Sequence, residues 1–109
     1  MAESQKCQVI PARFQVAGQQ ITVRIVPPSK WAHGDDCEGV WWPSKRRIEL
    51  LSTLKGEHRE QRFLHELMHC VLDIAGHPKL SDDEGLVDRV AHLLHQALTS
   101  CDVGRASKR

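Results

Sequence analysis

The spacing of apolar residues changes near the middle of the chain, from a period of two to a period of three to four. In the first half, apolar and polar residues alternate, most clearly in residues 21–26 (ITVRIV), which is typical of a half-buried strand. Glycine, proline and polar clusters separate this stretch from other short apolar stretches. The predicted strands cover residues 14–17, 21–26, 39–42 and 46–51, with turns at 18–20 and 43–45 and a loop over 29–38.

The second half of the chain predicts two helices. The first is expected over residues 57–75, because its apolar residues recur at helical spacing and Gly76 and Pro78 follow as stop signals. The second opens at Ser81, where Ser81 and Glu84 have the spacing of a capping box. Its predicted buried stripe consists of Leu86, Val87, Val90, Leu93, Leu94, Ala97 and Leu98. Strands followed by helices predict an α+β domain, with a small antiparallel or mixed sheet packed on the first helix and on a second, C-terminal helix.

Length and composition narrow the class of protein. The 109 residues suit a single domain over residues 1–109, with flexible ends at 1–12 and 102–109. Fifteen basic and fourteen acidic residues leave a net charge of +1, which disfavours nucleic acid and anionic lipid as partners. No apolar run approaches the roughly 20 residues of a membrane span, and the first residues lack the apolar core of a signal peptide. We therefore expect a cytoplasmic protein, of open oligomeric state.

The four cysteines do not form a metal-binding or disulfide framework that the sequence reveals. They are Cys7, Cys37, Cys70 and Cys101, about thirty residues apart and without a C-x-x-C pair. Reduced, mostly structural thiols are expected. Cys70 follows His69 directly, so its side chain leaves a helix about 100° away from the histidine and is a poor candidate for a metal ligand.

Residues 65–69 (HELMH) read H-E-x-x-H inside the first predicted helix. His65 and His69 are four residues apart and lie on one helix face, so two imidazole nitrogens can meet one Zn²⁺. Glu66 projects about 100° away and can take a proton from a metal-bound water that acts as the nucleophile. The alternative is an amphipathic helix with two surface histidines, but the apolar helical context on both sides of the motif favours zinc.

A catalytic zinc site requires a third protein ligand, for which Glu84 is the first candidate. Gly76 and Pro78 predict a sharp turn that folds the second helix back across the first, with Glu84 at its start. Glu84 could instead serve only as a cap for the Ser81 amide. Asp83 and Asp88 are the other candidates for the third ligand.

The chain resembles small zincin metallopeptidases of the ImmA/IrrE-like kind, in particular their short phage- and prophage-type members. The resemblance rests on residues 63–69 (FLHELMH) and 84–91 (EGLVDRVA), supported by the upstream Gly-Gln-Gln turn and by residues 48–50. It spans residues 14–98, and only H-E-x-x-H in it is a specific motif. It implies His65, His69 and Glu84 as zinc ligands, Glu66 as general base and a sheet over an active-site helix.

The resemblance has two departures. The third histidine of the long metzincin motif is absent, with Ala75 in its place, and the chain contains no tyrosine to assist an oxyanion. A histidine or arginine would have to take that role. His92 and His95 are candidates by position, although a solvated histidine pair on the polar side of the second helix is the simpler interpretation.

Three further residues are candidates for the surroundings of the metal. Asp73, one turn after His69, either orients a ligand histidine or is an ordinary polar residue near the helix end. Trp41 and Trp42 point to opposite faces of a strand, so one should pack against the helices and the other lie exposed or under a loop. The pair either lines the substrate cleft or belongs to the core.

The sequence thus favours a zinc-dependent metallopeptidase that hydrolyses a peptide bond in a protein or peptide substrate, with Zn²⁺ as cofactor. The resemblance adds a role in phage or mobile-element regulation. The alternative is a non-catalytic, zinc-stabilised module for protein interaction, or a virion-associated component on the same scaffold.

Overall fold

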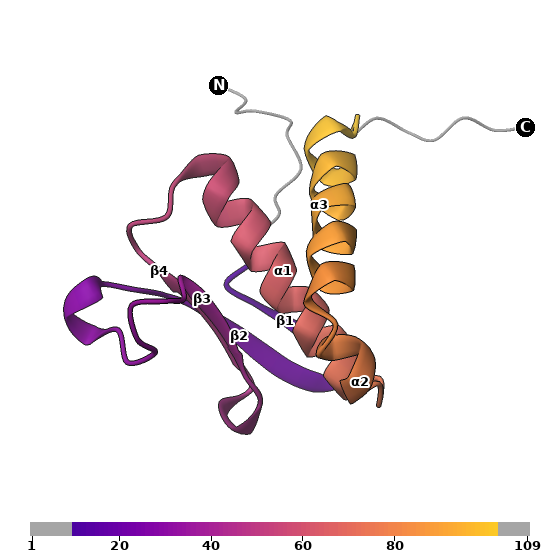
Figure 1. Ribbon diagram of the computed structural model, residues 1–109, viewed down its shortest axis with the longest axis horizontal. Coiled ribbons are helices and arrows are strands. Elements are labelled where there is room, and N and C mark those ends of the chain that lie inside the picture. Colours follow the sequence, from indigo (N-terminus) through magenta and orange to yellow (C-terminus); the bar gives the residue numbers. More distant parts are fainter. Residues whose placement is uncertain (1–9, 103–109) are drawn as a thin grey trace, which may run out of the picture.

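The computed structural model describes residues 10–102, which form a four-stranded sheet and three α-helices (Figure 1). The strands are β1 (Arg13–Val16), β2 (Gln19–Val26), β3 (Gly39–Trp42) and β4 (Arg47–Leu51). The helices are α1 (Gly56–Ile74), α2 (Pro78–Ser81) and α3 (Glu84–Ser100). The expected flexible ends lie almost wholly outside the described residues. The α+β class is confirmed.

The sheet is mixed, with the strand order β1-β2-β4-β3. β1 pairs antiparallel with β2, β2 parallel with β4, and β3 antiparallel with β4, so the predicted hairpin of β3 and β4 is confirmed. The first turn was placed wrongly. Ala17 and Gly18 both have positive φ, of 52° and 76°, which makes a two-residue hairpin turn and leaves Gln19 and Gln20 in β2. β3 lies at the edge of the sheet.

The core lies between the sheet and α1. On β4, Ile48 and Leu50 are fully buried, whereas Glu49 between them points to the other face of the sheet. Phe63 of α1 meets Phe14 of β1 edge-on, with ring centroids 6.2 Å apart. The remaining buried apolar residues of this core are Ile21, Trp41, Leu54, Leu64, Cys70 and Ala91.

α3 packs mainly on α1, on the side away from the sheet (Figure 1). Its buried residues are Val87, Ala91 and His95, each four residues from the next. The predicted apolar stripe is therefore wrong for Leu86, Leu93, Leu94 and Ala97, which are exposed. Among the described elements α3 packs mainly on one helix, so it buries only a narrow stripe and leaves the rest of its apolar face exposed.

The connection between α1 and α3 brings the start of α3 back to α1. Gly76 has a φ of 87°, and the amides of Gly76 and His77 donate to the carbonyls of Asp73 and Leu72, at 3.0 and 2.8 Å. This is a Schellman end, as Gly76 predicted. The predicted capping box is wrong. Ser81 ends the short helix α2, and Asp83 caps α3 by accepting a hydrogen bond from the Leu86 amide at 3.1 Å.

The cysteines follow the prediction in part. Cys37 and Cys70 are free thiols, whereas Cys101 is disulfide-bonded, so the expectation of reduced thiols is wrong for Cys101. Within residues 10–102, no helix combines the length and the apolar character that crossing a bilayer requires.

Candidate metal centre

His65 and His69 project from the same face of α1, as their spacing predicts. Both are largely shielded from solvent, with side chains 11% and 16% exposed. Their rings lie close together, with centroids 5.0 Å apart and planes inclined by 61°. The apolar residues around the motif, Leu64 and Phe63, are buried in the core, which fixes this face of α1 toward α3.

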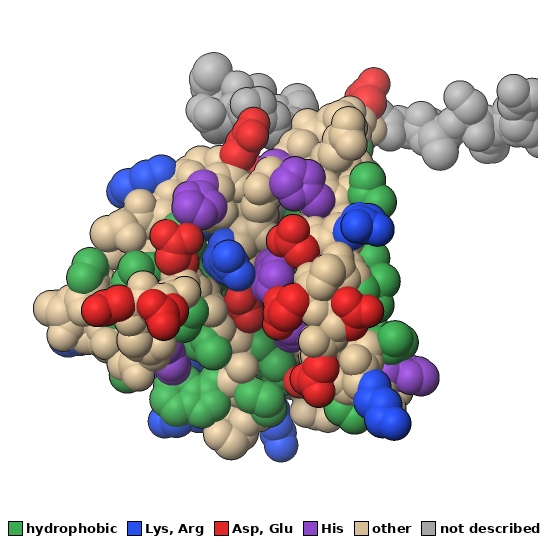
Figure 2. Space-filling model, viewed as in Figure 1, with side chains coloured by type: hydrophobic (Ala, Val, Ile, Leu, Met, Phe, Trp, Pro, Cys, Tyr) green, Lys and Arg blue, Asp and Glu red, His purple; other side chains and the backbone are tan. Residues whose placement is uncertain are grey.

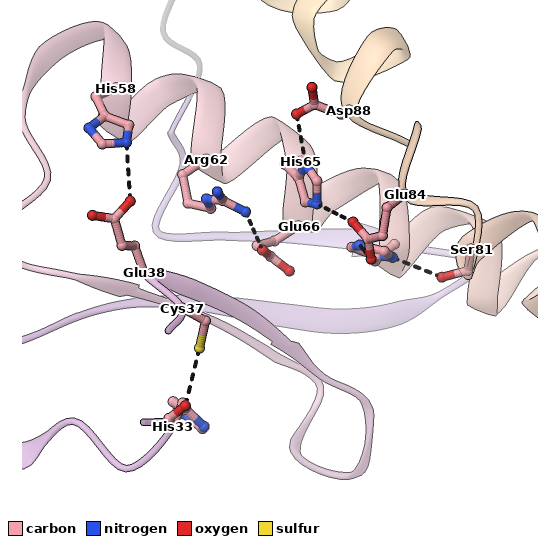
Figure 3. A network of polar contacts seen from close by, with 11 residues as sticks. His33, Cys37, Glu38, His58, Arg62, His65, Glu66, Ser81, Glu84 and Asp88 are labelled. Atoms are coloured by element: carbon pink, nitrogen blue, oxygen red, sulfur yellow. Dashed lines mark hydrogen bonds and ion pairs between the residues drawn. The ribbon is translucent and has the colours of Figure 1, made fainter. Parts of the chain in front are cut away.

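Glu84 supplies a carboxylate to both histidines. Its Oε1 lies 3.0 Å from Nε2 of His65, and its Oε2 lies 3.3 Å from Nε2 of His69 (Figure 3). One ligand atom from each of the three residues lies within 4.8 Å of the others. Glu84 is the first residue of α3, directly after the Asp83 cap, and that cap sets its position over α1. Of the three candidates for the third ligand, Glu84 is the one that contacts both histidines.

The other ring nitrogens of the two histidines differ in their surroundings. Nδ1 of His69 lies 3.0 Å from the hydroxyl of Ser81, which is buried. This contact turns Nε2 of His69 toward Glu84, as outer partners do for metal-bound histidines. Nδ1 of His65 lies 3.4 Å from Oδ1 of Asp88 and, among the described residues, makes no hydrogen bond. Asp88 therefore lies beside His65 without orienting its ring through a hydrogen bond.

The donor set fits Zn²⁺. Two imidazole nitrogens and one carboxylate are the protein ligands of many catalytic zinc sites, which keep a fourth position for water or substrate. The carboxylate of Glu84 is 67% exposed, so the centre is open to solvent on the α3 side. His65, His69 and Glu84 are the residues that would hold Zn²⁺ here.

Glu66 lies beside the histidines and is only 5% exposed. Its Oε2 lies 3.4 Å from Nη1 of Arg62, one helical turn earlier (Figure 3). Arg62 was not identified from the sequence, although its i, i+4 spacing from Glu66 was visible. Gly39 of β3 makes room for it, because a Cβ at this position would stand 2.6 Å from Cγ of Arg62.

A cavity of about 300 Å³ opens between β3, α1 and α2. Its lining includes Trp41, Glu66, His69 and Asp73, so Trp41 faces the candidate centre. The indole of Trp41 donates a 3.0 Å hydrogen bond to Asp73, and both ring nitrogens of His69 have other partners. Asp73 thus positions Trp41, and the suggestion that it orients a ligand histidine is wrong.

Trp42 points to the opposite face of the sheet, as strand geometry predicts. The ring of His33, from the β2–β3 loop, meets it edge-on with centroids 5.1 Å apart, and Nζ of Lys45 lies 4.7 Å from its ring centroid. Trp42 is half-buried under the loop and does not line the cavity at the centre.

A second cavity, of about 140 Å³, lies on the other side of His65. Its lining includes His58, Arg62, His65, Asp88 and His92. His92 thus lines a cavity beside the candidate centre. His95 does not: it is 5% exposed, and its Nε2 lies 2.9 Å from Oε1 of Glu60. The interpretation of His95 as a solvated residue is wrong, because this histidine belongs to the buried stripe of α3.

Cys70 is fully buried and takes no part in the centre. Burial, and then the charge of Asp73, raise the pKa of its thiol to about 11. A thiol that stays protonated at neutral pH is a poor metal ligand, so the structural role expected for Cys70 is confirmed.

Comparison with protein-family models, with curated proteins and with solved structures finds no match to this chain. The assignment of function therefore rests on the geometry of the centre.

Proposed function

We propose that this chain is a small zinc-dependent metallopeptidase with a zincin-like centre, of the ImmA/IrrE-like kind that its motif resembles. One observation carries the proposal: His65, His69 and Glu84, from two helices, converge on one point beside the buried carboxylate of Glu66. A structural zinc site needs only ligands, whereas a hydrolytic site also needs a base next to an open position.

Each residue of the centre has a role in this proposal. When bound, Zn²⁺ lowers the pKa of a coordinated water and polarises the scissile carbonyl. His65, His69 and Glu84 hold the metal, and Glu66 accepts the proton of the attacking water and passes it to the leaving amine. Arg62 contacts Glu66 at 3.4 Å and keeps its carboxylate on the side of the centre.

A polypeptide is the substrate that the surroundings suit best. β3 is an edge strand, so its outer backbone groups can pair with an extended peptide. Val40 and Trp41 of this strand line the cavity that also contains Glu66 and His69. Arg62 and His92, both on the side of His65, are side chains that could donate a hydrogen bond to a developing oxyanion.

The test combines metal analysis with peptide hydrolysis. Wild-type protein should bind one equivalent of Zn²⁺ and cleave susceptible sequences in a mixture of peptides, as detected by mass spectrometry. Glu66→Gln should keep the metal and lose activity by several powers of ten, because the base is removed while the ligands remain. Loss of zinc in Glu66→Gln would contradict the assignment of Glu66 as base.

The second candidate function is a non-catalytic zinc-stabilised interaction module, including a virion component. The exposed leucines of α3, Leu86, Leu93 and Leu94, favour it, because contiguous apolar surface marks sites of association. In that case wild-type protein and Glu66→Gln would bind zinc equally and neither would cleave any peptide.

A further inference from the structure

A cavity of about 240 Å³ opens between the β2–β3 loop and the end of β4, and the proposed reaction does not use it. Its apolar walls come from Pro28, Trp31 and Leu51, and its charged lining residues, Asp35 and Glu38, are both acidic. The volume is below the roughly 300–1,000 Å³ that holds a drug-sized ligand and suits a single side chain.

Hydrogen bonds within the loop hold the cavity in shape. The Trp31 indole donates to the carbonyl of Gly34 at 3.1 Å, and its ring meets His33 edge-on with centroids 4.8 Å apart. The amide of Leu51 donates to the carbonyl of Glu38 at 2.9 Å, which ties the loop to β4. Both acidic side chains remain reachable, since Asp35 is exposed and the side chain of Glu38 is 44% exposed.

The cavity is linked to the surroundings of the candidate metal centre through Glu38 and His58. Oε1 of Glu38 lies 3.2 Å from Nε2 of His58, and His58 lines the cavity beside His65. The side chains of Glu38 and Cys37 point in opposite directions, toward His58 and toward the carbonyl of His33 (Figure 3). Burial raises the pKa of the Cys37 thiol, and the charge of the Glu66 carboxylate raises it further.

Figure 2 shows that acidic side chains gather on this face of the molecule, with histidines among them. Glu38 also directly precedes β3, whose Val40 and Trp41 line the cavity that contains Glu66. An extended peptide that pairs with β3 can therefore continue toward Glu38 and place a more distant side chain in this cavity.

We propose that this cavity binds a lysine or arginine side chain of the polypeptide substrate, a few residues along the chain from the bond that is cleaved. The indole of Trp31 offers the aromatic face that best attracts a cation, and the methylene stem packs on Pro28 and Leu51. The carboxylates of Asp35 and Glu38 accept charge-assisted hydrogen bonds from the cationic end. A neutral side chain would gain the apolar contact without the ionic one. The proposal rests on the proposed function, because it names the substrate class of the same site.

Binding can be measured without catalysis. The probe is an acetylated and amidated peptide with a central arginine among alanines and serines, compared with the same peptide containing citrulline, which has nearly the same shape and no charge. Zinc-loaded Glu66→Gln protein, ¹⁵N-labelled, is titrated with each peptide and followed by NMR. We expect the arginine peptide to shift the Trp31 indole signal and to bind about 10-fold more tightly than the citrulline peptide, since two carboxylates and one aromatic face contribute.

Matched variants locate the effect. Asp35→Asn and Glu38→Gln should each weaken binding of the arginine peptide by about 3-fold, within the range of a partly exposed ion pair, and leave binding of the citrulline peptide unchanged. Asp36→Asn is the control. It removes the same charge at the next residue, and the side chain of Asp36 does not line the cavity.

Two results would overturn the proposal. One is equal binding of the arginine and citrulline peptides; the other is an equal loss in Asp36→Asn and Asp35→Asn, which would show only a long-range field. Zinc affinity measured on the same samples distinguishes failure of the cavity proposal from failure of the proposed metal centre. Zinc binding without discrimination rejects the cavity and keeps the metal centre, whereas discrimination without zinc binding rejects the centre and keeps the cavity.

Discussion

Two groups of histidines in this protein meet carboxylates in different ways. His95 pairs with one partner, Glu60, at 2.9 Å, and the pair joins α3 to α1. At the other end of these helices, His65 and His69 both turn Nε2 toward the same residue, Glu84, at 3.0 and 3.3 Å. The residue types are the same, and only the number of imidazoles per carboxylate differs.

The difference separates a structural contact from a candidate metal centre. A single imidazole and a single carboxylate are satisfied by one shared proton, as in the pair of His95 and Glu60. Two imidazoles that converge on one carboxylate form a three-donor set, which a cation satisfies better than protons do. His33 and Glu49, 2.8 Å apart with Arg47 as a second partner, are another closed pair. Convergence of donors, more than the presence of histidine, therefore marks the centre.

The largest expected effect is the link between zinc and stability. Zn²⁺ at about 100 times its dissociation constant should raise the free energy of unfolding by about 2.7 kcal/mol, because it binds only the folded arrangement of α1 and α3. The double variant His65→Ala and His69→Ala should show no such rise in urea denaturation. His77→Ala, at an exposed position, is the control and should keep it. An equal rise in the double variant would place the zinc elsewhere.

His95→Ala should lower stability without changing zinc binding. Removing a buried partner of Glu60 should lower the free energy of unfolding by about 2 kcal/mol, since a hydrogen bond to a charged group is lost and a small cavity is left. Zinc affinity, corrected for the unfolded fraction, should stay unchanged. A fall in zinc affinity comparable with that of His69→Ala would remove the distinction between the two groups.

Ser81→Ala should give a smaller, selective effect on the metal. The Ser81 hydroxyl lies 3.0 Å from Nδ1 of His69, so its removal should weaken zinc binding by about 10-fold, the lower range for a partner that orients a ligand. Competition with a chromophoric chelator measures this change. Ser44→Ala, at an exposed position, should bind zinc like the wild type. Wild-type affinity in Ser81→Ala would show that the hydroxyl does not orient His69.

The smallest expected effect concerns the closed pair on the far face of the sheet. Burial alone would raise the pKa of Glu49, but hydrogen bonds from His33 and Arg47 outweigh it and hold the pKa below the ordinary value of 4.5. Glu49 therefore contributes stability above its unfolded pKa, and this contribution is lost as the pH falls through the folded pKa. The difference between wild type and Glu49→Gln in urea denaturation should narrow on acidification below about pH 4.5. A constant difference across this range would contradict the lowered pKa.

Periodicity alone was enough to predict the strands and α1. Alternation in residues 21–26 and helical spacing in residues 57–75 reflect burial on one face, which a sequence records directly. The H-E-x-x-H motif was visible for the same reason, because His65 and His69 lie on one helix and their spacing fixes their geometry. Contacts within one element are thus the part of the site that the sequence predicts well.

Contacts between elements were predicted less well. Ser81 is a residue type that often caps helices, but Asp83 is the residue that caps α3. The hydroxyl of Ser81 contacts His69 instead. The exposed leucines of α3 have the spacing of a buried stripe, and nothing in the sequence pattern shows that, within residues 10–102, α3 packs mainly on α1 alone. The contact of Trp41 with Asp73 joins residues thirty-two positions apart, which no local pattern encodes.

The zinc affinity of Glu84→Gln tests the central claim most directly. Because Asp83 is the residue that caps α3, this substitution should leave the fold intact and remove only the charge that His65 and His69 share. Chelator competition should show zinc binding weakened by more than about 100-fold, beyond the range of partners outside the ligand set. Asp88→Asn should weaken it by less than about 10-fold, because Asp88 makes no hydrogen bond to His65. Wild-type affinity in Glu84→Gln, with release of the metal by Asp83→Asn or Asp88→Asn, would contradict the assignment of Glu84 as third ligand.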